Sequence, residues 1–130
     1  MDTVPSQDDD MVGVLVDACG WVSLIEAGLN LDLALESVVG EAELMVTDSV
    51  MTELQTLEED RGGLLLDLLV VRSKVVGNSQ GHTDDLLFSL SIENSWPVLT
   101  VDRGLKRRLV ESGSSYIEVT AGPSLRLITP

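Results

Sequence analysis

The sequence contains one cysteine and one histidine, and this scarcity excludes several kinds of site. Cys19 has no partner for an internal disulfide, which fits a reducing compartment. With no histidine or cationic residue close by, it is expected to be a small buried filler and not a nucleophile. His82 alone cannot build a His-rich zinc site, and its loop position indicates a solvated side chain. Walker, G-x-G-x-x-G, C-x-x-C and G-x-S-x-G motifs are also absent.

Long apolar runs and basic residues are scarce as well. No stretch approaches the roughly 20 apolar residues that span a bilayer, and the opening MDTVPSQDDD is acidic where a secretory signal would be basic. We therefore expect a cytoplasmic protein that does not enter membranes. Eight Lys and Arg against 22 Asp and Glu leave a net charge of -14, which disfavours broad, non-specific nucleic-acid binding. Adaptation to a salty cytoplasm and a simple acidic, solvated surface are both compatible with this balance.

What the chain does contain is enough apolar material for one core. Its 130 residues are 44% hydrophobic and have a mean hydropathy of +0.22, which argues against disorder. Residues 1–10 combine Pro5 with three consecutive aspartates and are predicted to be a flexible acidic arm. Residues 11–120 are predicted to form the domain. Residues 121–130 follow as a C-terminal extension or edge strand.

Short apolar runs alternate with helical patterns through this domain. The predicted strands are residues 12–16, 43–47, 74–76, 97–101 and 116–119. The predicted helices are residues 21–27, 31–39, a segment starting at 50, 64–71, 83–94 and 104–112. Such alternation implies right-handed crossovers. We predict a three-layer α/β/α sandwich around a mostly parallel sheet of about five strands.

One acidic residue lies beside the buried face of a predicted helix. Asp48 and Ser49 offer N-cap chemistry for the helix that starts at Val50. The apolar stripe of this helix consists of Val50, Leu54 and Leu57. Glu53 lies about 60° from the centre of the stripe, so it flanks the buried face.

Further acids stand where the predicted strands end. Asp17 closes the first strand, Asp84 and Asp85 open the helix after the third, and Asp102 follows the fourth. Carboxyl ends of parallel strands share one edge of a sheet. We therefore expect Asp17, Asp85 and Asp102 to converge, with Glu53 reaching in from its flank. Each also has an ordinary explanation as a helix cap or a surface residue.

The chemistry of such a cluster indicates a cation. Several ionised carboxylates within a few ångströms repel one another unless some are protonated or a cation neutralises them. An all-oxygen site suits Mg²⁺ or Mn²⁺, which activate water and stabilise charge on a phosphoryl group. Directly after Asp102 comes a basic stretch that either holds a phosphate backbone or is a solvated helix face. Its members are Arg103, Lys106, Arg107 and Arg108.

Four segments in this order, from about Val12 to Val119, resemble the PIN-domain nuclease family. VLVDACGWVSLIEAG is similar to the opening strand, with Asp17 as the metal-binding residue. Cys19 stands where that family often has Asn or Ser, beside the metal ligands. VMTELQTL is similar to the helix that carries the family's characteristic Glu, here Glu53.

The other two segments complete the resemblance. In HTDDLLFSL, Asp85 is the better match to the family's next metal ligand because the apolar helix follows it directly, and Asp84 is a further candidate. PVLTVDRGLKRRL resembles the T-x-D segment, with Thr100 as an orienting hydroxyl and Asp102 as the last acid.

This resemblance implies a metal-dependent endoribonuclease that leaves 5′-phosphate and 3′-hydroxyl ends and uses Mg²⁺ or Mn²⁺. The residues implied in catalysis and metal binding are Asp17, Glu53, Asp85 and Asp102, and those implied in RNA binding are Arg103, Lys106, Arg107 and Arg108. DDLL followed by VDRGLKRRL is more similar to the rRNA-processing branch of archaea and eukaryotes than to the VapC toxins, whose last motif usually runs D-R-D-F.

Three alternatives stay open at this level. The first is a VapC-like toxin of a toxin-antitoxin pair, and the second is a non-catalytic PIN scaffold that binds RNA or protein. The third is a receiver domain of two-component signalling, which needs paired acids after the first strand where only Asp17 stands. The partners implied are an RNA substrate, a protein such as an antitoxin or a ribosome-assembly factor, and a second copy in a homodimer.

Overall fold

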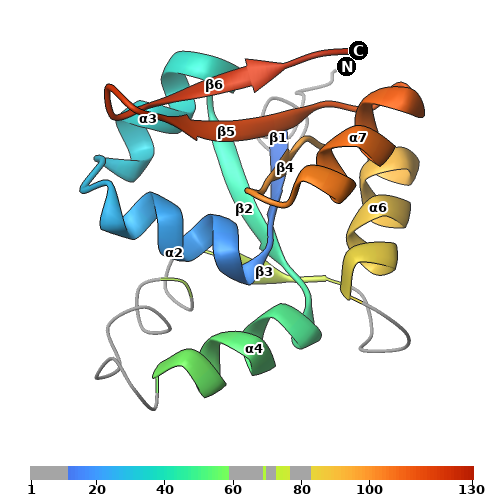
Figure 1. Ribbon diagram of the computed structural model, residues 1–130, viewed down its shortest axis with the longest axis horizontal. Helices are drawn as coiled ribbons and strands as arrows, with labels where there is room; N and C mark the ends of the chain where they lie inside the picture. Colours follow the sequence, from blue (N-terminus) through green and yellow to red (C-terminus); the bar gives the residue numbers. More distant parts are fainter. Residues whose placement is uncertain (1–11, 59–68, 70–72, 77–82) are drawn as a thin grey trace, which may run out of the picture.

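A six-stranded sheet forms the centre of the molecule (Figure 1). The computed structural model describes residues 12–58, 69, 73–76 and 83–130. The strands lie in the order β3-β2-β1-β4-β5-β6, and only β6 runs antiparallel to its neighbour. Their bounds are β1 Val12–Val16, β2 Ala42–Val46, β3 Ser73–Val75, β4 Val98–Leu99, β5 Tyr116–Thr120 and β6 Ser124–Ile128. The predicted mostly parallel sheet is confirmed, and the C-terminal extension adds β6 at its edge.

Helices cover both faces of the sheet. They are α2 Ala18–Glu26, α3 Leu31–Val39, α4 Asp48–Glu58, α6 Thr83–Asn94 and α7 Arg103–Glu111. The chain steps from β1 through β2 to β3 in one direction and from β3 through β4 to β5 in the other. Because crossovers between parallel strands are right-handed, α2, α3 and α4 lie on one face and α6 and α7 on the opposite face (Figure 1). This arrangement is the predicted α/β/α sandwich.

The core lies on both sides of β1. Val14, Leu15 and Val16 are fully buried, as an uninterrupted apolar run in a central parallel strand requires. On one side they meet Trp21 and Leu24 of α2. The helices of the other face contribute Leu87 from α6 and Leu105 and Leu109 from α7. The fold therefore holds the carboxyl end of β1 rigidly in the middle of the sheet.

Two helices begin earlier in the chain than predicted, because local polar contacts cap them there. Helix α2 begins at Ala18 and not at residue 21, because Asp17 caps it directly. Helix α4 begins at Asp48, and the Val50 N–H donates to Thr47 Oγ1 at 3.3 Å. Thr47 thus supplies the cap that the sequence assigned to Asp48 or Ser49.

A second correction concerns the far end of α4. Leu57 was expected in the apolar stripe with Val50 and Leu54, but 36% of it is exposed while the other two are fully buried. Val50 and Leu54 in the first two turns join the core, and the described core does not extend to Leu57. The expectations for residues 1–10, for His82 and for all but residue 69 of the predicted helix 64–71 lie outside the described residues; Leu69 itself is buried.

Candidate active site

Asp17 occupies the switch point of the sheet, where β1 lies between β2 and β4 and the strand order reverses. Its side chain is 7% exposed. One carboxylate oxygen, Oδ1, accepts the Gly20 N–H at 2.6 Å and caps α2. The other oxygen accepts the hydroxyl of Thr100. Both oxygens are therefore held in place, and the carboxylate has little freedom to rotate.

Thr100 connects the ends of β1 and β4. It is fully buried, its hydroxyl donates to Asp17 Oδ2, and its Oγ1 accepts the Asp102 N–H at 3.1 Å. Asp102 in turn caps α7, because its Oδ1 accepts the Leu105 N–H at 2.9 Å. One buried hydroxyl thus fixes the carboxylate of Asp17 and the backbone from which the carboxylate of Asp102 projects.

Gly20 allows this close packing, and the sequence alone did not indicate its role. A Cβ at this position would lie 2.3 Å from the Leu99 carbonyl oxygen and 2.8 Å from Asp17 Oδ1. Neither neighbour can move freely, because Leu99 belongs to β4 and Asp17 is the cap. The only signal in the sequence is a glycine three residues after a capping aspartate.

The substitution Gly20→Ala is therefore expected to destabilise the protein despite the higher helix propensity of alanine. Overpacking a tight contact costs about 1–3 kcal/mol, and the propensity gain offsets at most about 1 kcal/mol. Urea unfolding measures the difference. Gly122→Ala is the matched control, since a Cβ at Gly122 meets nothing within 4 Å. Equal midpoints for wild type and Gly20→Ala would show that α2 can move away from β4 at little cost.

Carboxylates from four parts of the chain surround one hollow of about 290 Å³, here called the acidic pocket. Glu53 reaches it from α4, and its Oε1 accepts the Thr83 hydroxyl at 2.9 Å. Asp84 reaches it from the first turn of α6. The residues that line the pocket are Asp17, Ala18, Cys19, Glu53, Thr83, Asp84, Val101 and Asp102.

The two adjacent aspartates of α6 have different surroundings. Asp85, which the resemblance favoured as a ligand, does not line the acidic pocket. Its Oδ1 accepts a hydrogen bond from Arg108 Nη1 at 2.9 Å, and both side chains are largely exposed. Consecutive helical residues point about 100° apart, so only one of the two can face the pocket. The structure places Asp84 there.

Burial, together with the crowding of like charges, raises the pKa values of two carboxyl groups in the pocket. Burial raises the pKa of Asp17 from 3.8 to about 6, and the charges of Asp84 and Asp102 act in the same direction against the lowering effect of the Thr100 and Gly20 hydrogen bonds. Burial also raises the pKa of Asp84, assisted by Asp102 and Glu53, while Arg108 opposes the rise. The pocket favours a bound positive charge, either a proton or a cation.

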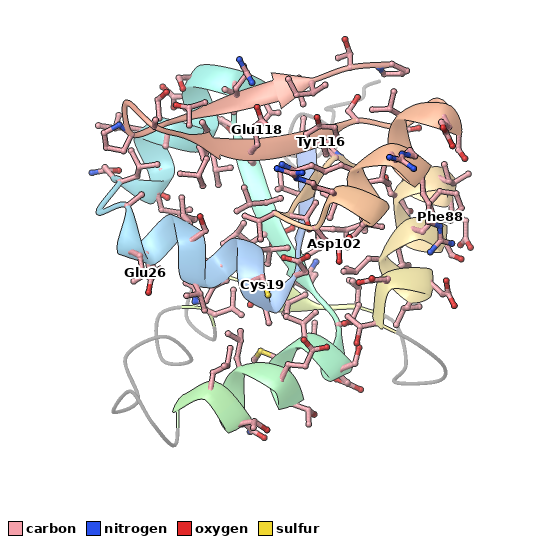
Figure 2. The ribbon with its side chains drawn as sticks, in the orientation of Figure 1. Cys19, Glu26, Phe88, Asp102, Tyr116 and Glu118 are labelled. Atoms are coloured by element: carbon pink, nitrogen blue, oxygen red, sulfur yellow. The ribbon has the colours of Figure 1, made fainter. Side chains whose placement is uncertain are left out.

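The position of Cys19 differs from the buried one that the sequence predicted. It is exposed at the start of α2 and lines the acidic pocket, although the sequence suggested a buried filler (Figure 2). The buried face of α2 is formed by its neighbours Ala18, Gly20 and Trp21, which turns Cys19 outward. Partial burial and then the charge of Asp17 raise the pKa of the thiol, so it stays protonated at neutral pH. A protonated thiol is a weaker nucleophile than a thiolate.

The basic residues of α7 point in three directions. Lys106 donates to Glu118 Oε1 of β5 at 3.2 Å, and its Nζ lies 5.2 Å from the centroid of the Tyr116 ring. Arg108 faces α6, where it bonds Asp85 and lies 4.5 Å from the centroid of the Phe88 ring. Arg103 and Arg107 are exposed, and among the described residues neither forms an ion pair.

The donor chemistry of the acidic pocket suits a hard divalent cation. Its ionisable oxygen donors, the carboxylates of Asp17, Glu53, Asp84 and Asp102, are those that Mg²⁺ and Mn²⁺ prefer. As the side chains lie, however, no group of three or more His, Cys, Asp or Glu residues in the described part of the chain is arranged to hold an ion. Binding therefore requires a rearrangement, which the exposed Glu53 and Asp102 allow more readily than the fixed Asp17.

Fold and pocket together define a class: an α/β protein with a parallel sheet whose switch point carries an acidic pocket. The chain belongs to the PIN-like domain family, whose model matches residues 14–121. Among solved structures, its fold is similar to that of the PIN domain endonuclease Utp24, with a TM-score of 0.69 and 18% identity over 88% of this chain and 90% of that chain. No curated protein sequence matches the chain significantly. The predicted family is confirmed.

Two further observations concern parts of the molecule away from the acidic pocket. In the described part of the chain, no helix is both long enough and apolar enough to cross a bilayer. A cavity of about 440 Å³ lies at the opposite edge of the sheet from the acids, where Val12 begins β1 and Pro97 precedes β4. Its lining is serine-rich and contains no ionisable side chain. This cavity therefore offers none of the carboxylates that the acidic pocket provides.

Proposed function

We propose that this protein is a metal-dependent endoribonuclease that hydrolyses RNA phosphodiester bonds in rRNA processing or RNA turnover. The observation that carries the proposal is the buried Asp17 carboxylate, held by Thr100 and Gly20 in one pocket with three further carboxylates. Membership of the PIN-like family and a fold similar to a protein described as an endonuclease support it.

Asp17, Glu53, Asp84 and Asp102 would hold Mg²⁺ or Mn²⁺. A bound ion of this kind supplies an activated water and stabilises charge on the phosphoryl group. Asp17 provides the fixed point of the site, because both of its oxygens are already oriented. Glu53 and Asp102 are exposed and supply adjustable carboxylates. We assign Asp84 the role for which the sequence favoured Asp85, because Asp84 lines the pocket and Asp85 is paired with Arg108.

The chain also supplies what a polyanionic substrate needs near the acids. Arg108 lies against Asp85 and beside Asp84 and Glu53 in a second hollow of about 420 Å³ that adjoins the acidic pocket. Arg103 directly follows Asp102 and points to solvent. These guanidinium groups offset the negative field of the protein locally, which allows a phosphate backbone to approach.

Cleavage of a structured RNA by the purified protein in the presence of Mn²⁺ tests the proposal. Cleavage is expected with Mn²⁺ or Mg²⁺ and not with a chelator, and the products should carry 5′-phosphate ends. The Asp17→Asn and Asp102→Asn variants serve as controls for contamination. Cleavage that persists unchanged in both variants would refute the assignment.

Metal titration is expected to stabilise the wild type and gives a readout besides cleavage. A ligand that binds only the folded state adds RT ln(1 + [L]/Kd), about 2.7 kcal/mol at a hundredfold excess over Kd. Thermal melting with increasing Mn²⁺ should therefore raise the Tm of the wild type but not of a double Asp17→Asn, Asp84→Asn variant. A wild-type Tm that neither ion changes would favour a non-catalytic scaffold.

A further inference from the structure

A further hollow, of about 360 Å³, lies between α7 and β5 and shares no lining residue with the acidic pocket. We call it the α7–β5 hollow. Three of its lining residues are cationic, three are apolar or aromatic, and none is acidic; they are Arg103, Lys106, Arg107, Val110, Tyr116 and Ile128. In a chain of net charge -14 such a lining is exceptional, and it selects for an anion that also carries an apolar surface.

We propose that the α7–β5 hollow binds one nucleotide of a single-stranded RNA near the bond that is cleaved. This inference rests on the proposed nuclease function and adds the substrate contacts. Arg103 and Arg107 hold phosphate at the rim, and the base lies against the apolar floor formed by Tyr116, Val110 and Ile128. A combination of cationic groups that track the backbone with an aromatic surface for the base is the general solution for single strands.

The helical positions on α7 decide which cations are available. Leu105 and Leu109 are buried, so the opposite side of the helix, centred on Arg107, faces solvent. Arg103 lies one turn earlier on the same side. Arg108 projects toward α6, where it stacks on Phe88 and bonds Asp85. Arg103 and Arg107 therefore remain for phosphate.

Lys106 has a different part in the hollow. Its ammonium group is held between Glu118 and the Tyr116 ring, as the neighbouring positions of Tyr116 and Glu118 on β5 indicate (Figure 2). Arg126 also donates to Glu118, and these hydrogen bonds lower the pKa of that carboxyl. The ion pair and the cation–π contact fix the Tyr116 ring against α7. We therefore treat Lys106 as a positioning residue for the aromatic surface and not as a primary phosphate ligand.

The location of the hollow connects it to the proposed chemistry. Asp102 lines the acidic pocket and caps α7, and the next residue, Arg103, lines the hollow. A chain of RNA that passes the acids can thus continue along the outer side of α7 without crossing another element. The exposed Val101, which borders the acidic pocket, adds apolar surface at the junction. A paired base would keep its face inside the helical stack, so the hollow discriminates against duplex RNA.

Fluorescence anisotropy with a labelled single-stranded RNA oligonucleotide, in a chelator that prevents cleavage, tests this subsite. Tyr116→Leu and Arg107→Gln are each expected to weaken binding on the order of tenfold, whereas Tyr116→Phe keeps the ring and should bind like the wild type. Lys74→Gln, which removes an exposed cation on β3, is the charge-matched control. A duplex of the same sequence should bind at least about tenfold more weakly than the single strand.

Salt dependence separates the phosphate contact from the stacking contact. The slope of log K against log salt should decrease in magnitude by about 0.7 in Arg107→Gln and stay unchanged in Tyr116→Leu. Equal affinities of the wild type, Arg107→Gln and Tyr116→Leu would overturn the subsite even if the wild type cleaves RNA. Binding that depends on both residues without any cleavage in Mn²⁺ would keep the subsite and refute the proposed nuclease. Circular dichroism melting of each variant excludes loss of folding as the cause.

Discussion

Asp84→Asn is expected to reduce kcat/KM for RNA cleavage by at least about a hundredfold, while Asp85→Asn changes it by less than about tenfold. The reason is geometric. Asp84 lines the acidic pocket with Asp17, Glu53 and Asp102, so its loss removes a carboxylate from the proposed metal site. Each 1.4 kcal/mol of lost transition-state stabilisation lowers the rate about tenfold, and metal ligands contribute several kcal/mol. An exposed ion pair such as Asp85 with Arg108 contributes at most about 1 kcal/mol.

Steady-state kinetics with Mn²⁺ at saturating concentration measures these effects. Glu93→Gln, an equivalent loss of one negative charge on an exposed part of the same helix, should leave the rate unchanged. The opposite ranking, with Asp85→Asn inactive and Asp84→Asn active, would restore the assignment that the sequence resemblance favoured. It would also require α6 to rotate in the active enzyme.

Asp17→Asn is expected to raise the stability of the metal-free protein at neutral pH, and the gain should disappear in acid. The pKa of about 6 in the folded protein lies about two pH units above the ordinary value of 3.8. A carboxyl whose pKa is raised on folding binds protons more tightly when folded, so its charge destabilises the fold above that pKa. Two pH units correspond to about 3 kcal/mol at neutral pH, which falls toward zero as the pH decreases from about 6 to about 4.

The net gain is smaller than this figure. Asparagine has one carbonyl oxygen where aspartate has two, so either Gly20 N–H or the Thr100 hydroxyl loses its acceptor, at a cost of about 1 kcal/mol. We expect the variant to melt roughly 5 °C above the wild type at about pH 7 in a chelator, and slightly below the wild type at about pH 4, where only the cost of the lost hydrogen bond remains. Asp48→Asn, which alters an exposed aspartate at the start of α4, should not stabilise at either pH. A lower Tm of Asp17→Asn at neutral pH would contradict the raised pKa.

Both predictions follow from a conflict between the stability of the protein and its proposed ability to bind a metal ion. The burial and charge crowding that destabilise the metal-free protein are the same features that attract a cation. A substitution that relieves them is expected to stabilise the protein and to inactivate it. The charge of Asp17 therefore lowers the stability of the metal-free protein, and binding of the proposed metal ion would offset that loss.

Much of the fold follows from patterns within the sequence. The apolar run before Asp17 predicts a buried central strand, and Val14, Leu15 and Val16 are fully buried. Leu31 to Val39 has helical periodicity with Gly40 at its end, and α3 has those bounds, with Gly40 at a φ of 80°. These features depend on neighbouring residues and on the alternation of apolar and polar positions, which are visible in the chain itself.

The local errors have a common origin in contacts between distant segments. Leu57 continues the apolar stripe of α4, but it is 36% exposed and lies outside the core that the described residues form. Cys19 is small and moderately apolar, but α2 turns it into the acidic pocket. Gly20 looks like an ordinary glycine until the carbonyl of Leu99 is placed against it. Periodicity predicts on which face of its own helix a side chain lies. Which other residues that side chain contacts depends on how the helices and strands pack together.

By itself, the sequence determined the alternation of strands and helices, the family, and the acids that stand at the ends of these elements. Local hydrophobic patterns and short-range capping encode such features. Only the tertiary structure decided that Asp84 and not Asp85 faces the pocket with Asp17, that Thr100 joins the ends of β1 and β4, and that Tyr116 contacts Lys106 in a hollow that two exposed arginines also line. Those relations join residues far apart in the chain, and their geometry depends on the rotation of α6 and α7 against the sheet, which packing sets to within a fraction of a helical turn.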